Sequence, residues 1–275
     1  MIPKKIHYCW LSGDPLPEKI QQCMQTWQRT MPEYELVLWD TNKFDITSIP
    51  FVHEAYQQRK WAFAADYIRL YALYTEGGIY LDTDVIVKQK FDELLKCGFF
   101  TSVEQNVDSY FDEETLAVAK ASGLDLSQDR DITIQAAVLG AIAGHPYIKA
   151  CMEWYEDKHF INEDGIYFDK IVAPDIYAYV LKQFGFEYQD KQQSLPNNTI
   201  IYPSHTFPNG SLVGDKLHPK TYAVHCFFGE WRANSWSQEI LKKIESSRWL
   251  RRVFHKRIYK NTEEIINEDI MKNQG

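Results

Sequence analysis

Two aspartates interrupt an apolar segment in the first third of the chain. Asp82 and Asp84 lie within residues 78–87, which are otherwise typical of a β-strand. Residues two apart on a strand point to the same side, so we expect the two carboxylates on one face. A bound divalent cation relieves the repulsion between such charges, and Mg²⁺ or Mn²⁺ would also bind a substrate phosphate. An Asp-x-Asp pair is also found at polar strand ends and in Asx turns.

A charged pair precedes this segment on a predicted helix. Apolar residues at positions 63, 67, 70, 71 and 74 predict a helix over 61–74. Asp66 and Arg69 are three residues apart and therefore share a face. They form either an ordinary intrahelical ion pair or a site that offers a carboxylate and a guanidinium to a ligand with hydroxyls and phosphates. Gly77-Gly78 then ends the helix and turns the chain into the strand.

The first 40 residues indicate the fold class. Residues 4–10 and 34–40 read as strands around a helix over 18–29, which predicts a β-α-β unit in an α/β layer fold. Ligands of such sheets bind beyond the carboxyl ends of the strands, so Trp10 and the aspartate pair are expected at one crevice. A further short strand is expected at 186–189, and another at 222–225 that ends in His225.

The motifs taken together resemble a known family. Ala65-Asp66-x-x-Arg69 followed by Gly77-Gly78-x-Tyr80-Leu81-Asp82-x-Asp84 resembles the core of the sugar-nucleotide glycosyltransferases with an Asp-x-Asp motif. The pattern is most similar to glycosyltransferase family 32, which holds capsular polysaccharide transferases and fungal Golgi mannosyltransferases, and is related to the glucosyltransferase domains of large bacterial toxins. The resemblance spans residues 1–90 and part of 220–236. It implies a GT-A-type α/β fold with a mainly parallel central sheet, flanking helices and helical additions.

The resemblance implies a metal centre. Asp84, with Asp82, and His225 as the third protein ligand would hold Mn²⁺ or Mg²⁺ against the diphosphate of the donor. Asp82 would alternatively contact the ribose or the sugar through water. A lone histidine on a strand is more often a buried structural residue, which is the other interpretation of His225.

The resemblance also implies a donor pocket. Asp66 and Arg69 would bind the sugar hydroxyls, Tyr80 would line the pocket, and Trp10 would stack on the uracil of a UDP-sugar. A tryptophan at a strand end is otherwise a core residue. His7, in the same segment as Trp10, is interpreted as structural.

Two further positions are assigned to the site. Gln135 interrupts the apolar run 132–142, where a buried amide is costly unless it is hydrogen-bonded. It is either a core hydrogen-bonding residue or, as related retaining transferases imply, a catalytic pocket residue near the anomeric carbon.

In the family pattern a Gly-Ser-Trp follows the metal-binding histidine. Here Glu230 replaces the serine, so either Trp231 or the later Ser235-Trp236 is expected to close over the donor as a lid.

Composition limits the compartment and the partners. The chain has 275 residues, 45% of them hydrophobic, and five scattered cysteines without Cys-x-x-Cys spacing, which favours a reducing compartment. No signal peptide or transmembrane run is recognised, so a cytoplasmic protein is expected. The formal net charge of the chain is −8. Residues 240–260 carry a local charge of +7, so the rest of the chain carries −15. The acidic body argues against nucleic acid, and the basic segment is expected either to pack on the body or to bind an anionic membrane.

These expectations define one enzyme and two alternatives. Residues 1–239 are expected to form the GT-A domain, with a donor part at 1–90 and an acceptor part at 91–239, followed by a basic helix and tail at 240–275. The enzyme would be a retaining hexosyltransferase that uses UDP-galactose or UDP-glucose ahead of GDP-mannose. Its acceptor would be a lipid-linked saccharide, and the enzyme would take part in capsular or surface polysaccharide synthesis. The alternatives are a Mg²⁺-dependent phosphatase of the haloacid dehalogenase type and a non-catalytic carbohydrate-binding module.

Overall fold

A computed structural model describes residues 1–106, 111–126, 131–210 and 217–226 of the chain. It confirms the predicted β-α-β start, in which β1 and β2 are parallel and α1 connects them. The elements, in chain order, are β1 (Lys5–Cys9), α1 (Glu18–Thr30), β2 (Glu35–Trp39), α2 (Pro50–Gln57), α3 (Trp61–Glu76), β3 (Gly78–Leu81), β4 (Val85–Val87), the 3₁₀-helix η1 (Leu94–Lys96), β5 (Phe99–Gln105), α4 (Glu113–Ala121), β6 (Ile132–Ile134), β7 (Val138–Ala141), α5 (Pro146–Glu156), α6 (Ala173–Lys182), β8 (Gln193–Leu195), β9 (Thr199–Tyr202), η2 (Ser204–Thr206) and β10 (Ala223–His225).

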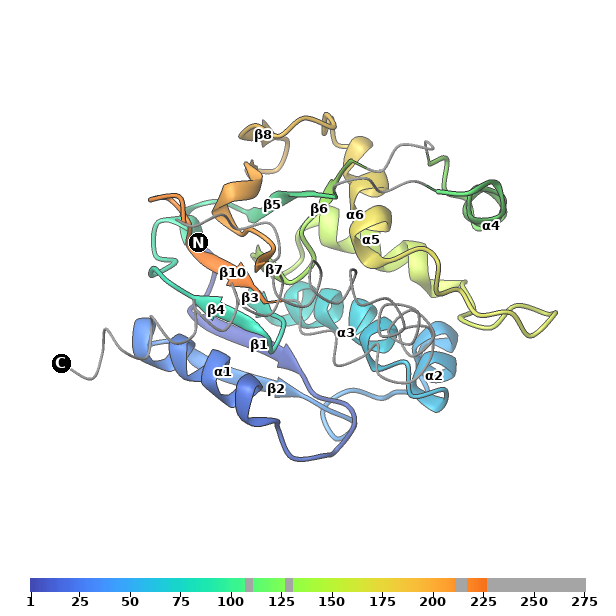
Figure 1. Ribbon diagram of the computed structural model, residues 1–275, viewed down its shortest axis with the longest axis horizontal. Coiled ribbons are helices and arrows are strands. Elements are labelled where there is room, and N and C mark those ends of the chain that lie inside the picture. Colours follow the sequence, from blue (N-terminus) through green and yellow to red (C-terminus); the bar gives the residue numbers. More distant parts are fainter. Residues whose placement is uncertain (107–110, 127–130, 211–216, 227–275) are drawn as a thin grey trace, which may run out of the picture.

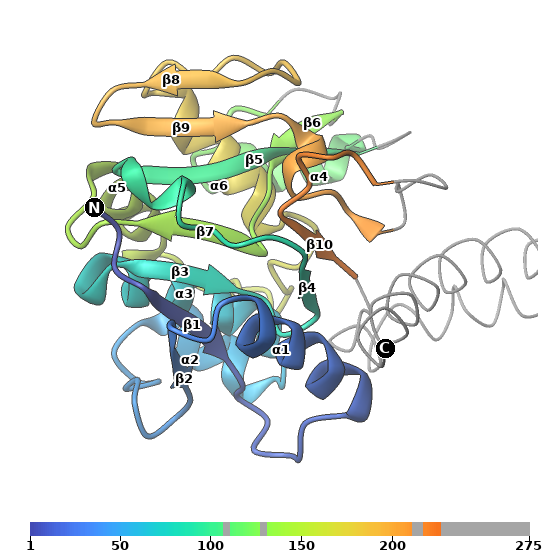
Figure 2. The same cartoon turned by 90° about the vertical axis from the view of Figure 1, so that its left-hand side faces the viewer.

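A central sheet of eight strands organises these elements. Its order is β2-β1-β3-β7-β5-β9-β8, with β6 paired to β5 (Figure 2). Strand β3 is parallel to β1, whereas β7 is antiparallel to both β3 and β5. Together with the parallel pairs β1–β2 and β5–β9, this means that β2, β1, β3, β5 and β9 run in one direction. The predicted α/β class with a mainly parallel sheet and flanking helices is therefore confirmed.

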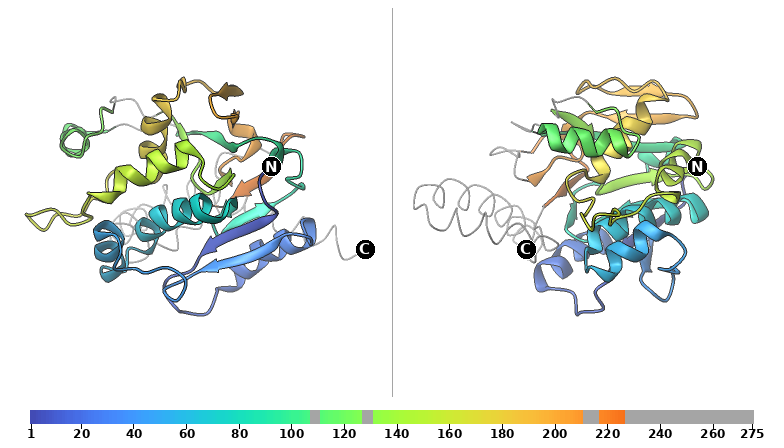
Figure 3. Two further views of the ribbon diagram at one scale, coloured as in Figure 1. Left: turned by 180° about the vertical axis from the view of Figure 1, so that it is seen from behind. Right: turned by 90° about the vertical axis from the view of Figure 1, so that its right-hand side faces the viewer.

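The sheet separates two hydrophobic cores. Alternate residues of one strand enter different cores, as Phe99 and Phe100 of β5 do. One core lies under α2, α3, α5 and α6, which stand in front of the sheet in the right-hand panel of Figure 3. The other lies under α1 and the small antiparallel sheet of β4 and β10, which Figure 1 shows on the near side. The carboxyl ends of β1, β3 and β5 therefore meet at one edge between the two layers.

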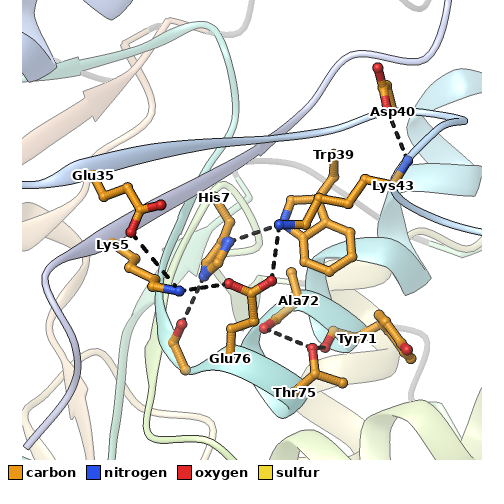
Figure 4. Close-up of polar contacts among 11 residues, drawn as sticks. Lys5, His7, Glu35, Trp39, Asp40, Lys43, Tyr71, Ala72, Thr75 and Glu76 are labelled. Atoms are coloured by element: carbon orange, nitrogen blue, oxygen red, sulfur yellow. Dashed lines mark hydrogen bonds and ion pairs between the residues drawn. The ribbon is translucent and has the colours of Figure 1, made fainter.

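A polar cluster around the buried His7 and Trp39 holds the turn between α3 and β3 in place (Figure 4). Trp39 Nε1 donates to His7 Nδ1 at 3.0 Å, so the other nitrogen, Nε2, carries the proton that bonds the carbonyl of Gly77 at 2.7 Å. Burial lowers the pKa of His7, which keeps this ring neutral. Glu76, at the end of α3, is paired with Lys5 at 2.9 Å and Lys43 at 3.0 Å. The structural interpretation of His7 is therefore confirmed.

Two local expectations were wrong. Asp82 and Asp84 do not lie on one strand, because β3 ends at Leu81 and the amide of Val85 donates to the Asp82 carbonyl at 3.1 Å to close a turn. No strand forms at 186–189. There the side chain of Gln193 bonds both the amide and the carbonyl of Glu187 at 2.9 Å, so these backbone groups are satisfied without a neighbouring strand.

Candidate active site

Three potential metal ligands converge where β3 ends. The turn after β3 presents Asp82 and Asp84, and β10 pairs antiparallel with β4 so that His225 lies opposite Val85. One ligand atom from each of the three side chains lies within 4.8 Å of the other two. The Nε2 atom of His225 is 3.3 Å from Asp84 Oδ1. The turn thus brings the two carboxylates together although they do not share a strand face.

The donor set suits a divalent cation. Two carboxylates and one imidazole are oxygen and nitrogen ligands of the kind that Mg²⁺ and Mn²⁺ accept, and three protein ligands leave coordination positions for water or phosphate oxygens. Within the described residues no other three acidic, histidine or cysteine side chains come together in this way. Asp82, Asp84 and His225 therefore fit the predicted metal centre, and their role as ligands stays a prediction.

The carboxylates around His225 change the pKa of its imidazole, so the protonation of this ring affects metal binding. Burial of the ring disfavours its charged form, but the carboxylates of Asp84, Asp82 and Glu104 outweigh burial and raise the pKa of His225 to about 9. In the metal-free protein the imidazole is therefore protonated at neutral pH, and its positive charge compensates the aspartates. A metal ion must replace that proton before the ring can serve as a ligand.

We expect metal affinity to rise with pH for this reason. Below pH 9 the affinity of the wild-type protein for Mn²⁺ should increase roughly tenfold per pH unit, and it should level off above that pH. Calorimetry at pH 7 in buffers of different ionisation enthalpy should detect the release of about one proton per ion bound. The His225→Ala variant is the control, with weaker binding and no such release. Wild-type affinity that does not vary with pH would contradict the assignment of His225.

Because of the same raised pKa of His225, the stability of the metal-free protein should fall as the pH rises, whereas its metal affinity should increase. The folded-state pKa lies above the ordinary value of 6.5. Protonation of His225 therefore stabilises the fold fully below pH 6.5, and this contribution is lost as the pH rises through about 9. Urea unfolding in the presence of a chelator measures this loss.

A buried ion pair lies beside the metal ligands. Arg69 Nη2 is 2.9 Å from Asp66 Oδ1 and 3.6 Å from Asp82 Oδ1. Its Nη1 donates to the carbonyl of Ala136 at 2.8 Å, and its Nε donates to that of Ala65 at 3.3 Å. Only 4% of Arg69 is exposed. The guanidinium is thus held by neighbours on α3, by the turn after β3 and by the segment before β7.

Burial gives Asp66 an unusual protonation equilibrium. Desolvation raises the pKa of its carboxyl to about 7, although the Arg69 guanidinium opposes the shift and Asp82 adds to it. The Tyr177 hydroxyl donates to the backbone carbonyl of Asp66 at 2.7 Å, which fixes this turn of α3 against α6. The helix therefore presents Asp66 and Arg69 together, as the sequence predicts, but in a buried pair rather than at an exposed surface.

Tyr80 and Trp10 lie at the ends of neighbouring strands. The hydroxyl of Tyr80 donates to Asp82 Oδ1 at 2.9 Å, and the guanidinium of Arg69 lies 4.8 Å from the centre of the Tyr80 ring. Tyr80 is fully buried, so its hydrogen bond holds the Asp82 carboxylate from the interior of the protein. Trp10 follows β1, is partly exposed, and donates through Nε1 to the carbonyl of Asp14 at 2.6 Å. Its proposed contact with a nucleobase stays a prediction.

Gln135 is bonded to the backbone on both sides of its amide. Its Oε1 accepts from the amide of Ala137 at 2.8 Å, and its Nε2 donates to the carbonyl of Phe207 at 3.3 Å. Only 1% of the residue is exposed. These contacts shape the segment that binds Arg69 through Ala136, and a direct role for Gln135 near the anomeric carbon stays a prediction.

Several predicted features lie outside the described residues. These are the lid candidates Trp231, Ser235 and Trp236, and the basic segment 240–260. Among the helices that the structure does describe, none is both long enough and apolar enough to cross a membrane.

The structure also reveals a residue that the motif search missed. Glu104, near the end of β5, is 8% exposed and acts on the charge of His225. Its sequence signal is an acid near the end of a short segment, 99–103, in which Phe99, Phe100 and Val103 are apolar; Asp82 likewise follows the apolar residues of β3.

Comparison with known proteins relates the first third of the chain to a family. Residues 17–99 match the model described as "Glycosyltransferase sugar-binding region containing DXD motif". Inositol phosphoceramide mannosyltransferase 3 of Schizosaccharomyces pombe is 36% identical over 98 residues, which are 34% of this chain and 27% of that protein. Mannosyl phosphorylinositol ceramide synthase SUR1 of Saccharomyces cerevisiae is 23% identical over 258 residues, 90% of this chain and 55% of that protein. The chain thus spans only a quarter to about half of these relatives.

Similar solved structures include sugar transferases. A galactosyltransferase, LgtC, solved with donor and acceptor sugar analogues, matches with a TM-score of 0.43 and 12% identity over 89% of this chain and 96% of that chain.

Proposed function

We propose that this chain, whose residues 17–99 match a DXD-type glycosyltransferase region, is a metal-dependent glycosyltransferase of the GT-A type. The observation that carries the proposal is the convergence of Asp82, Asp84 and His225 within 4.8 Å, beside the buried Arg69. The family match and the mannosyltransferase relatives support a glycosyltransferase. The substrate is a nucleotide-diphospho-sugar that donates a hexose to a saccharide acceptor.

Each group in the site has a task in this reaction. Asp82, Asp84 and His225 hold Mn²⁺ or Mg²⁺, which supplies charge neutralisation for the departing diphosphate when bound. Arg69 fixes Asp66 and Asp82 relative to each other, because its guanidinium is paired with both.

Asp66 and Arg69 then bind the sugar hydroxyls, and Trp10 stacks on the base. Trp231 or Ser235-Trp236 closes over the donor and excludes water. The reaction retains the anomeric configuration, and the departing phosphate oxygen takes the acceptor proton.

The family resemblance at Trp10 suggests the donor, and the names of two relatives suggest the acceptor. The resembling families place an aromatic residue at the position of Trp10 against uracil, which favours UDP-galactose or UDP-glucose ahead of GDP-mannose. Both curated relatives carry names of mannosylated inositol phosphoceramides, which supports a lipid-linked acceptor and makes a mannose donor a necessary member of any screen. A role in capsular or surface polysaccharide synthesis at the inner face of the cell membrane, with 240–260 on anionic lipid, completes the proposal.

A donor-cleavage screen tests the proposal. Wild-type protein is incubated with UDP-glucose, UDP-galactose and GDP-mannose, with Mn²⁺ or with a chelator, and the released nucleotide is measured. Metal-dependent cleavage of one donor supports the transferase, and the anomer of the transfer product, read by NMR, tests retention. Cleavage of phosphate monoesters but of no donor would favour the phosphatase, although that class carries its motif on the first strand and here it follows β3. Saccharide binding without turnover would favour a binding module.

A further inference from the structure

Glu104 lies at the same sheet edge as the metal ligands. Strand β7 is antiparallel to both β3 and β5, so β3 and β5 run in the same direction. Glu104 is the last residue but one of β5, and Asp82 follows the last residue of β3. Both carboxylates therefore stand at the carboxyl ends of their strands, where the proposed site is built.

Glu104 also lies on the face of the sheet from which His225 approaches. Phe99 and Val103 enter the core under α3, whereas Phe100 enters the core under α1 and β10. Glu104 is four residues from Phe100 and so shares its face. The Phe100 ring packs 6.1 Å from the ring of Phe207, and the next residue, Pro208, accepts a hydrogen bond from the His225 amide at 3.0 Å.

Burial and charge define what this carboxylate does there. Both Glu104 and His225 are 8% exposed, and the negative charge of Glu104 acts on the imidazole through space. Glu104 does not belong to the group of three whose ligand atoms lie within 4.8 Å of one another. It is thus a buried acid outside that group of three, on the face of the sheet opposite α3.

We propose that Glu104 is a positioning residue of the metal centre, which accepts a hydrogen bond from a water molecule on the cation and adds negative charge next to His225. A cation with three protein ligands retains water, and carboxylates outside the ligand set commonly bond such groups. Loss of such a partner typically weakens metal affinity ten- to a hundredfold. This inference rests on the proposed metal-dependent function and assigns a residue that the Asp-x-Asp pattern does not contain.

The test is a direct measurement of Mn²⁺ affinity by electron paramagnetic resonance, without any donor. Glu104→Gln keeps the shape of the side chain and should weaken affinity at least tenfold. Glu104→Asp keeps the charge but withdraws it by one methylene, and should weaken affinity measurably but less than Glu104→Gln does. Glu187→Gln, which removes one charge from an exposed residue, is the matched control and should bind as the wild type does.

The outcomes separate this inference from the proposed function. If the wild type binds Mn²⁺ and cleaves a donor but both Glu104 variants bind within twofold of it, the assignment of Glu104 is wrong and the function stands. If the wild type binds no Mn²⁺, the proposed function itself fails. Thermal unfolding of metal-free protein shows whether Glu104→Gln is folded. If it is not, the affinity of Glu104→Asp decides, since an unchanged value would overturn the inference.

Discussion

Replacing Asp84 with alanine is expected to reduce metal-dependent donor cleavage on the order of 10³-fold, as loss of a group that stabilises charge in the transition state does. Asp84 faces His225 at 3.3 Å and belongs to the group of three ligands. Its removal leaves one carboxylate and one imidazole, so the cation would lose one of its two negatively charged protein ligands. Steady-state kinetics of nucleotide release measures the loss, and Mn²⁺ binding by electron paramagnetic resonance should weaken in parallel.

The control for this variant is Asp45→Ala. Asp45 also lies in a turn, where it accepts hydrogen bonds from the amide and the hydroxyl of Thr47, but it is exposed. Its loss should leave donor cleavage within about twofold of the wild type, since surface substitutions rarely change a fold by much. If Asp84→Ala keeps more than a tenth of the wild-type rate in Mn²⁺, the catalytic cation is held elsewhere.

Local patterns in the sequence predicted the parts of the site that lie close together in the chain. Helical periodicity placed Asp66 and Arg69 on one face of α3, and Gly77 with its φ of 64° ends that helix where a left-handed conformation is needed. The strand assumed for Asp82 and Asp84 was wrong because alternation of apolar residues cannot distinguish one long strand from two short ones joined by a turn. The aspartates nevertheless point to the same place.

Long-range pairing explains what the sequence alone could not supply. Nothing local to Val85 indicates that β4 pairs with β10, yet this pairing brings His225 to Asp84. Only the resemblance to a family suggested His225 as a ligand. Glu104 was missed for the same reason, because its place at the same sheet edge as Asp82 depends on the antiparallel β7 that separates β3 from β5. Burial of Arg69 could not be predicted either, since it depends on the carbonyl of Ala136.

Arg69 links these distant parts, so its removal is expected to have the largest effect on stability. Arg69→Met should destabilise the fold by about 3–5 kcal/mol, because it leaves the buried Asp66 without its partner. Asp66 Oδ1 lies 2.9 Å from the guanidinium. The pKa of Asp66, about 7 with Arg69 present, should rise further without it, so the loss should be smaller in acid than at pH 8. Urea unfolding of metal-free protein at both pH values measures the difference.

A double variant separates the charge of Arg69 from its packing. Asp66→Asn combined with Arg69→Met removes both members of the pair and should recover most of the lost stability, since two neutral groups need no compensation. Donor cleavage should stay low in the double variant, because the proposed ligands of the sugar hydroxyls are gone. A single Arg69→Met variant that unfolds within about 1 kcal/mol of the wild type would show that Asp66 is stabilised by other groups. The expected result for the double variant, stability that returns without activity, would mean that the buried pair is kept for binding the donor rather than for folding.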